Sequence, residues 1–148
     1  MIATIAACIA DAKEDCDRGE FLTKIKKLIS ECHQINHVTY AVDSKGKRGI
    51  FAERKAGKLV YSIATGGSPA TLSHFAAVNG QADVLQALLE NNHFPNKVIL
   101  DNLQNTVTAS QIAYENKHDE FLNVLHDRNE VVTCRACTAP CDAHCTIV

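Results

Sequence analysis

The chain has 148 residues and a net charge of −2; 46% of its residues are hydrophobic and 22% are charged. This balance is typical of a folded globular protein and excludes a disordered or fibrous chain. A near-neutral net charge removes the electrostatic basis for binding nucleic acid or an anionic membrane through net charge alone, so we expect no nucleic-acid partner. No stretch approaches the roughly 20 apolar residues that span a bilayer.

Cysteine is the one unusual component, with seven residues that are unevenly placed. Three lie near the N-terminus and four lie near the C-terminus, with none between residues 33 and 133. A secreted disulfide scaffold distributes an even number of cysteines through its fold, so we expect an intracellular, reducing location. The apolar residues 1–10 have no preceding basic residue and are followed by acids, which favours a core helix over a signal peptide.

The first third of the chain has the apolar spacing of two helices, and Gly19 marks the break between them. The stripe of the first helix consists of Ile2, Ile5, Ile9 and Ala12, and that of the second lies in residues 21–32. We interpret Cys8, Cys16 and Cys32 as small core residues within this helix pair. One enzymatic alternative stays open, in which one of these thiols pairs with His33 or His37 as a nucleophile.

Residues 38–64 change to the pattern of short strands. Residues 38–42, 50–53 and 59–64 are rich in β-branched and aromatic side chains, and polar, glycine-bearing turns separate them. This pattern predicts a small β meander. Its basic turns could contact phosphate or an acidic partner, although solvated turn tips account for them more simply.

The second half of the chain contains a repeat with an offset of 37 residues, which brings Thr71 onto Thr108 and Ala76 onto Ala113. Each copy opens with threonine, continues through a short helix with small residues, and is followed by a helix rich in large aliphatic residues. Threonine suits a helix N-cap, and Gly80 suits a sharp exit from the first helix. The segment is similar to the ankyrin repeat, whose first helix opens T-P-L-H-x-A.

The resemblance covers residues 66–127 and departs from the family at three positions. Leu72 and Ala109 replace the family proline, and Lys117 replaces the family glycine, which weakens the prediction for the second turn. About three repeats are needed to bury a continuous core, so the N-terminal helices and the meander are expected to cap the two copies.

Membership of the ankyrin family would imply a protein-binding scaffold with no catalytic activity and no cofactor. Its partners contact loop tips and the inner faces of the first helices. Mapped onto this chain, the expected partner-binding residues are Thr65, Gly66, Gly67, Ser68, Val78, Asn79, Asn102, Leu103, Gln104, Asn105, Glu115 and Asn116. The resemblance also implies that His74 and His118 bond to backbone and fix loops, while we expect His126 at the surface.

The last 20 residues have no helical or strand period and end in Cys145-Thr-Ile-Val148. This ending resembles the C-a-a-X box, in which a protein prenyltransferase attaches an isoprenoid to the cysteine. One lipid chain binds a membrane only marginally, so a second signal is expected. Candidate palmitoylation sites that would supply it are Cys134, Cys137 and Cys141. The choice between farnesyl and geranylgeranyl stays open.

Two other interpretations of the tail remain. Cys134, Cys137, Cys141 and His144 are ligands of the type that zinc prefers, although their spacing matches no common zinc pattern. The thiols could also stay unmodified.

Together the sequence predicts a mainly α (α+β) protein. We expect an N-terminal helix pair in 1–36, a β meander in 37–65, two ankyrin-type helix-turn-helix repeats in 66–127 and a flexible Cys-rich tail in 128–148. The expected function is a non-enzymatic protein-interaction module, prenyl-anchored to the cytoplasmic face of a eukaryotic membrane. Short repeats with a C-a-a-X box also resemble small effector proteins of intracellular bacteria such as Legionella, which are modified by the host. The alternatives are a soluble ankyrin adaptor with an inert or zinc-binding tail, or a thiol enzyme.

Overall fold

The computed structural model describes residues 1–12 and 17–128. Within them the helices are α1 (Ile2–Asp11), α2 (Arg18–Glu31), α3 (Leu72–Val78), α4 (Ala82–Glu90), α5 (Ala109–Glu115) and α6 (Asp119–Asp127). The strands are β1 (Ala41–Asp43), β2 (Gly46–Lys55), β3 (Lys58–Ala64), β4 (Ile99–Leu100) and β5 (Thr106–Val107).

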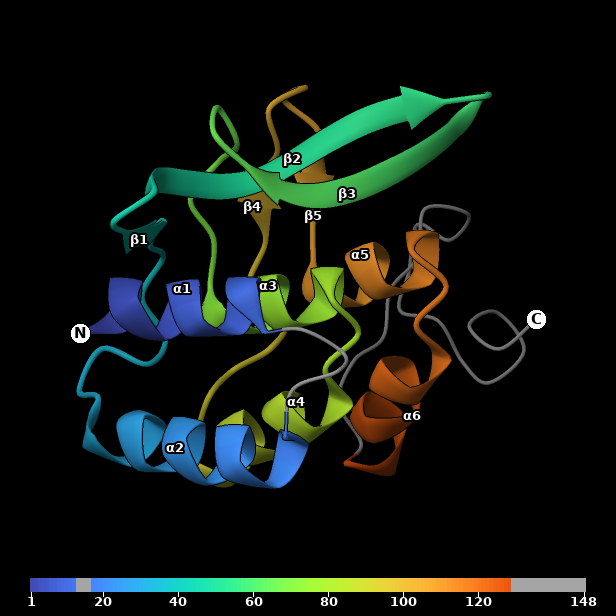
Figure 1. The fold of residues 1–148 in the computed structure, drawn as a ribbon. Helices are drawn as coiled ribbons and strands as arrows, with labels where there is room; N and C mark the ends of the chain where they lie inside the picture. Colours follow the sequence, from blue (N-terminus) through green and yellow to red (C-terminus); the bar gives the residue numbers. More distant parts are fainter. Residues whose placement is uncertain (13–16, 129–148) are drawn as a thin grey trace.

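The six described helices form two parallel layers (Figure 1). The first layer consists of α1, α3 and α5, and the second of α2, α4 and α6; neighbours within each layer pack together. The strands lie on the opposite side of the first layer from the second layer. The predicted fold class is therefore confirmed: an α+β protein with an N-terminal helix pair, a meander and two helix-turn-helix units. The N-terminal pair stacks on the two units as the first member of a three-pair array.

A β connection joins each helix pair to the next. Strands β1, β2 and β3 form an antiparallel meander between α2 and α3, and β4 pairs with β5 between α4 and α5. Strand β2 is ten residues long and begins inside the segment that the sequence predicts as a turn. The β2–β3 turn is tight, with positive φ at both Ala56 (51°) and Gly57 (78°), which is the backbone form that suits a two-residue hairpin.

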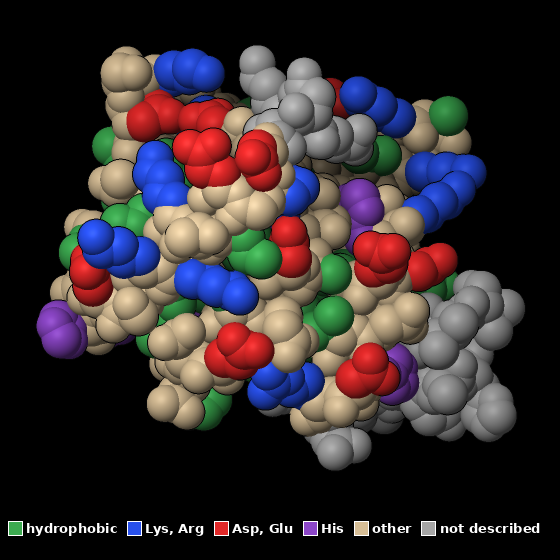
Figure 2. Space-filling model, turned by 60° about the horizontal axis from the view of Figure 1, so that its bottom comes forward, with side chains coloured by type: hydrophobic (Ala, Val, Ile, Leu, Met, Phe, Trp, Pro, Cys, Tyr) green, Lys and Arg blue, Asp and Glu red, His purple; other side chains and the backbone are tan. Residues whose placement is uncertain are grey.

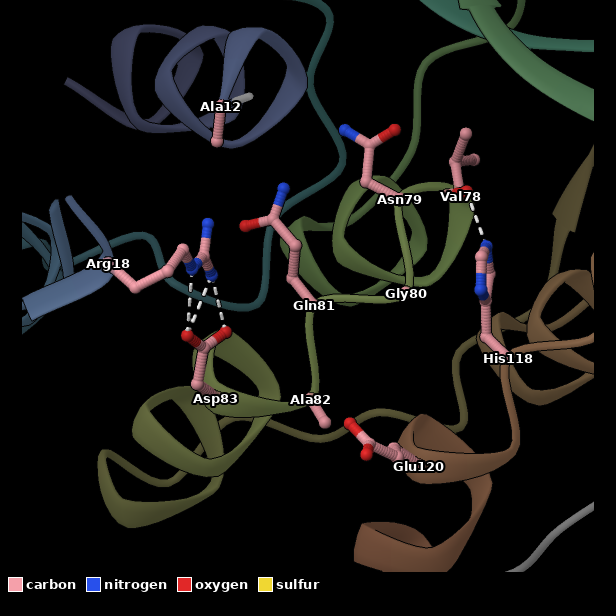
Figure 3. Close-up of a pocket in the computed structure, with 10 residues that line it drawn as sticks. All are labelled: Ala12, Arg18, Val78, Asn79, Gly80, Gln81, Ala82, Asp83, His118 and Glu120. Atoms are coloured by element: carbon pink, nitrogen blue, oxygen red, sulfur yellow. Dashed lines mark hydrogen bonds and ion pairs between the residues drawn. The ribbon is translucent and has the colours of Figure 1, made fainter. Parts of the chain in front are cut away.

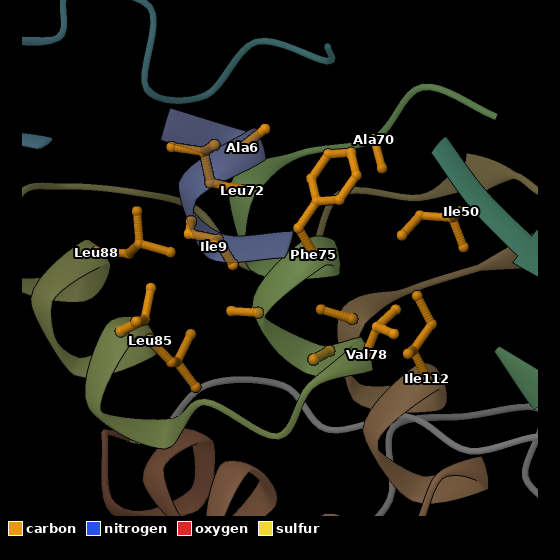
Figure 4. Packing of buried hydrophobic residues seen from close by; sticks show 14 of the residues in the cluster. Ala6, Ile9, Ile50, Ala70, Leu72, Phe75, Val78, Leu85, Leu88 and Ile112 are labelled. Carbon is orange, nitrogen blue, oxygen red and sulfur yellow. The ribbon is translucent and has the colours of Figure 1, made fainter. Parts of the chain in front are cut away.

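The core lies between the helix layers and under the meander (Figure 4). Helix α1 is apolar almost throughout because α3 covers one side of it and β1 packs against it as well. Arg48 strengthens this contact with ion pairs to Asp11 (Nη1–Oδ1 2.9 Å) and Asp43 (Nη2–Oδ2 2.8 Å). The hydrogen bonds from Arg48 lower the pKa of the Asp11 carboxyl. The meander thus helps to cap the helix array.

Gly19 does not separate the N-terminal helices, contrary to the sequence interpretation. It lies in the first turn of α2, which begins after the N-cap Asp17; the Asp17 carboxylate accepts a hydrogen bond from Glu20 N at 3.2 Å. A carboxylate at this position satisfies a backbone donor of the first turn, so the helix begins before the glycine. No helix in the described part of the chain is long and apolar enough to cross a bilayer.

Candidate functional site

The two helix-turn-helix units begin with the same hydrogen-bonded cap. Thr71 N donates to His74 Nδ1 (3.3 Å), and Thr108 N donates to Gln111 Oε1 (2.7 Å). Each threonine hydroxyl also lies within hydrogen-bond distance of a serine two residues on, at 2.9 Å in the first unit and 3.0 Å in the second. The threonines are thus N-caps as predicted. The His74 and Gln111 side chains play the same role in the two units, because each accepts a hydrogen bond from the backbone N–H of the N-cap threonine.

His74 joins the two units. Its side chain is fully buried, and its Nε2 lies 3.4 Å from the carbonyl oxygen of Val107, which accepts the hydrogen bond. Burial lowers the pKa of His74 to about 4, so the ring is neutral at neutral pH. The loop-fixing role expected for His74 is therefore present, directed at the strand that precedes α5.

The exit turn of each unit binds the first helix of the preceding pair. Gln81 Nε2 donates to Ile9 O at 2.8 Å, and Asn79 Nδ2 donates to the same oxygen at 3.2 Å. In the next unit, His118 Nε2 lies 3.0 Å from Val78 O, which also accepts from Asn116 Nδ2 at 3.3 Å. Carbonyls near a helix C-terminus lack partners within the helix, so these side chains fix the stacking of successive pairs.

Two asparagines hold the long hairpin on the helix array. Asn102 bonds to both N and O of Ala52, and Asn116 bonds to both N and O of Tyr61. Ala52 and Tyr61 face each other across β2 and β3, so the two amides grip one residue pair from its opposite edges. The buried Asp101 completes the connection, since its carboxylate organises the β4–β5 turn and lies 3.4 Å from the Tyr61 hydroxyl. Sequence reasoning missed both clamps.

A polar cavity of about 640 Å³ opens where the exit turns meet α2 (Figure 3). On one wall Arg18 Nη2 is paired with Asp83 Oδ1 at 2.6 Å. Beside them lies Gln81, whose buried Oε1 has no hydrogen-bond partner among the described residues, and Glu120 adds a carboxylate to the lining. These groups make the lining polar, but the Asp83 carboxylate is already paired and Gln81 Oε1 is buried, and they do not form a nucleophile–base pair.

The predicted partner-binding residues divide into two groups. Exposed at turn tips are Thr65, Gly66, Leu103 and Gln104. The second group is half-buried or buried and consists of Gly67, Ser68, Val78, Asn102, Asn105, Glu115 and Asn116. Within it, the side-chain amides of Asn102 and Asn116 bind the backbone of the hairpin. Asn79 is exposed, although its amide nitrogen is bonded to α1. A partner can therefore reach the turn tips directly, whereas most of the remaining positions have contacts within the chain.

Four large apolar side chains are exposed on the β4–β5 hairpin and on the segment that leads into it; the sequence predicted Leu103 as a partner-binding residue but not the other three. Leu100 and Leu103 on the β4–β5 hairpin are 50% and 46% exposed, and Val98 and Phe94 on the segment leading into it are 54% and 70% exposed. Val98 and Leu100 are two residues apart in an extended segment, which puts them on one face. The apolar run of residues 98–100 between polar neighbours was the available signal.

The thiols of the enzymatic alternative are half-buried. Cys8 lies on α1 and Cys32 is the C-cap of α2, while Cys16 lies outside the described residues. Among the described residues, neither thiol is hydrogen-bonded to His33 or His37, both of which are exposed. The buried histidine of this region is His93, whose Nδ1 donates to Ile35 O at 3.0 Å and whose pKa burial lowers to about 4.

The tail residues Cys134, Cys137, Cys141, His144 and Cys145 lie outside the described residues. Within the described part, no group of three or more His, Cys, Asp or Glu side chains is placed to hold a metal ion. Compared with known protein families, curated proteins and solved structures, the chain matches none of them.

Proposed function

We propose that the chain is a non-enzymatic protein-interaction module that is held on the cytoplasmic face of a eukaryotic membrane by an isoprenoid on Cys145. The observation that carries the interaction role is the repeated contact between units, in which Asn79 with Gln81 and Asn116 with His118 bind the preceding first helix. Stacked helix pairs with a hairpin between successive pairs resemble an ankyrin array, which serves as a scaffold for binding other proteins.

The exposed apolar side chains of Val98, Leu100 and Leu103, on and beside the β4–β5 hairpin, form the partner-binding surface that we favour. About half of each of these side chains is exposed to solvent, and exposed large apolar side chains of this type form the anchors of protein interfaces. The β4–β5 hairpin is held rigidly by Asp101, so its tip is organised before a partner binds. The proposed partner is therefore a protein with an apolar pocket or groove.

A crosslinking experiment tests this surface. A photo-crosslinking amino acid at Leu103 in cells should capture a discrete partner, and Leu100→Asp should abolish the capture because a charge would be buried in the interface. The same crosslinker at the exposed Lys24 of α2 is the control. Equal capture from both positions, or capture that survives Leu100→Asp, would contradict the proposed surface.

The anchor is tested by Cys145→Ser. In a eukaryotic cell the variant should move from the membrane fraction to the cytosol, because no thioether can form. The intact mass of the wild-type protein should show an isoprenoid together with loss of residues 146–148. Unchanged membrane association in the variant, or one equivalent of chelatable zinc in place of the lipid, would reject the anchor.

A further inference from the structure

The end of the β2–β3 hairpin concentrates positive charge. Arg54, Lys55 and Lys58 are all exposed there, in a chain whose net charge is −2. Lys117, on the α5–α6 turn, lines the same surface cavity of about 380 Å³ as Lys58, so a fourth cation lies beside the hairpin end, together with the single carboxylate of Glu115. We call these four residues the basic tip. On the face in Figure 2, by contrast, acidic and basic side chains are interspersed.

The charge of the basic tip does not stabilise the hairpin. Lys55 and Lys58 lie directly opposite each other in the strand register, and like charges in that position are destabilising. The turn between them holds Ala56 at φ 51°, a conformation that alanine adopts at a cost. The ion pair of Lys55 with Glu53 (3.3 Å) joins exposed side chains, 67% and 52% accessible, and so contributes little. A contact outside the chain accounts for the charge better than the fold does.

We propose that the basic tip binds the headgroups of anionic phospholipids. This inference rests on the proposed anchor, since it supplies the second membrane signal that a single isoprenoid needs. The tip packs beside the α5–α6 turn, and α6 then spans about 14 Å before the tail departs. Cys145 lies 17 positions after Arg128 in the sequence, and a chain of that length spans at most about 60 Å, so the lipid and the tip can engage one bilayer together.

Vesicle binding by the unprenylated full chain tests the tip separately from the anchor. We expect binding to phosphatidylcholine vesicles containing 30% phosphatidylserine, no binding to phosphatidylcholine alone, and loss of binding as salt screens the charges. Each basic residue near an anionic surface strengthens binding roughly fivefold, so Arg54→Gln/Lys55→Gln/Lys58→Gln should weaken it by about 100-fold.

The matched control is Lys24→Gln/Lys26→Gln/Lys27→Gln, which removes three exposed charges from α2, in the helix layer farther from the hairpin. It should change vesicle binding less than about fivefold. Neither variant should have a thermal midpoint below that of the wild type, because the tip variant only removes the repulsion between Lys55 and Lys58. An equal loss of vesicle binding in the two variants would show that binding depends on the net charge of the chain and not on the basic tip, and would overturn the proposal. Binding to an acidic peptide without binding to anionic vesicles would overturn it too. The intact mass from eukaryotic cells decides the anchor independently of either result.

Discussion

The two helix-turn-helix units, Thr71–Glu90 and Thr108–Asp127, share a backbone but differ in the residues that achieve it. At the exit turn, Gly80 has φ 66° and Lys117 has φ 62°. Gly80 has no alternative, because a Cβ there would meet the imidazole of His118 from the next unit. The Lys117 side chain is exposed. The backbone conformation is therefore required in both units, whereas the glycine is required only where another unit stacks on it.

The opening caps support the same conclusion. His74 and Gln111 both accept a hydrogen bond from the N-cap threonine, but His74 is fully buried and also bonds to Val107 of β5, the strand that leads into the next unit. Gln111 is only half-buried. The inner unit therefore has side chains that serve two neighbours, and the outer unit has simpler substitutes.

Gly80→Ala should give the largest effect on stability. The left-handed conformation costs alanine about 1–2 kcal/mol, and the clash with His118 adds overpacking of about 1–3 kcal/mol. We expect the free energy of unfolding in urea to fall by about 3 kcal/mol. Lys117→Ala is the matched control and should change the unfolding free energy by less than about 0.5 kcal/mol, because a Cβ is already present there. Similar losses in both variants would contradict the difference between the units.

His74→Gln should reduce the acid sensitivity of the fold. The pKa of His74 is about 4 in the folded chain and near 6.5 when unfolded. Between these values the unfolded chain binds more protons, so this contribution to stability is complete above about pH 6.5 and is lost as the pH falls toward 4. The loss amounts to about 3 kcal/mol for a shift of this size.

Unfolding free energies at pH 7 and pH 4.5 measure this effect. The wild type should lose more unfolding free energy between pH 7 and pH 4.5 than the His74→Gln variant does. Of the two buried histidines with a lowered pKa, the variant retains only His93. If the variant loses as much unfolding free energy between the two pH values as the wild type does, protonation of His74 is not coupled to unfolding. A glutamine is the conservative replacement, because Gln111 already makes the same cap in the second unit.

Local features of the chain were predictable from its sequence, and distant ones were not. The threonine caps and the turn at Gly80 depend on neighbouring residues, so spacing and residue type identify them. The clamps of Asn102 on Ala52 and Asn116 on Tyr61 join residues 50 and 55 positions apart, and a lone asparagine in a turn does not indicate its distant partner. The burial of His93 was equally hidden, because it lies in a loop without periodicity.

Lys117→Gly should give the smallest effect and the opposite sign. Glycine removes the left-handed strain at φ 62° but adds freedom to the unfolded chain, so the net gain is about 0.5 kcal/mol. That corresponds to a rise of about 1–2 °C in the thermal midpoint for a chain of this size. Lys117→Ala again serves as the control, with no rise. A fall in the midpoint on Lys117→Gly would mean that the lysine stem packs beside Lys58 and stabilises the hairpin end. The outer unit would then also be fixed by a neighbouring element, the β2–β3 hairpin.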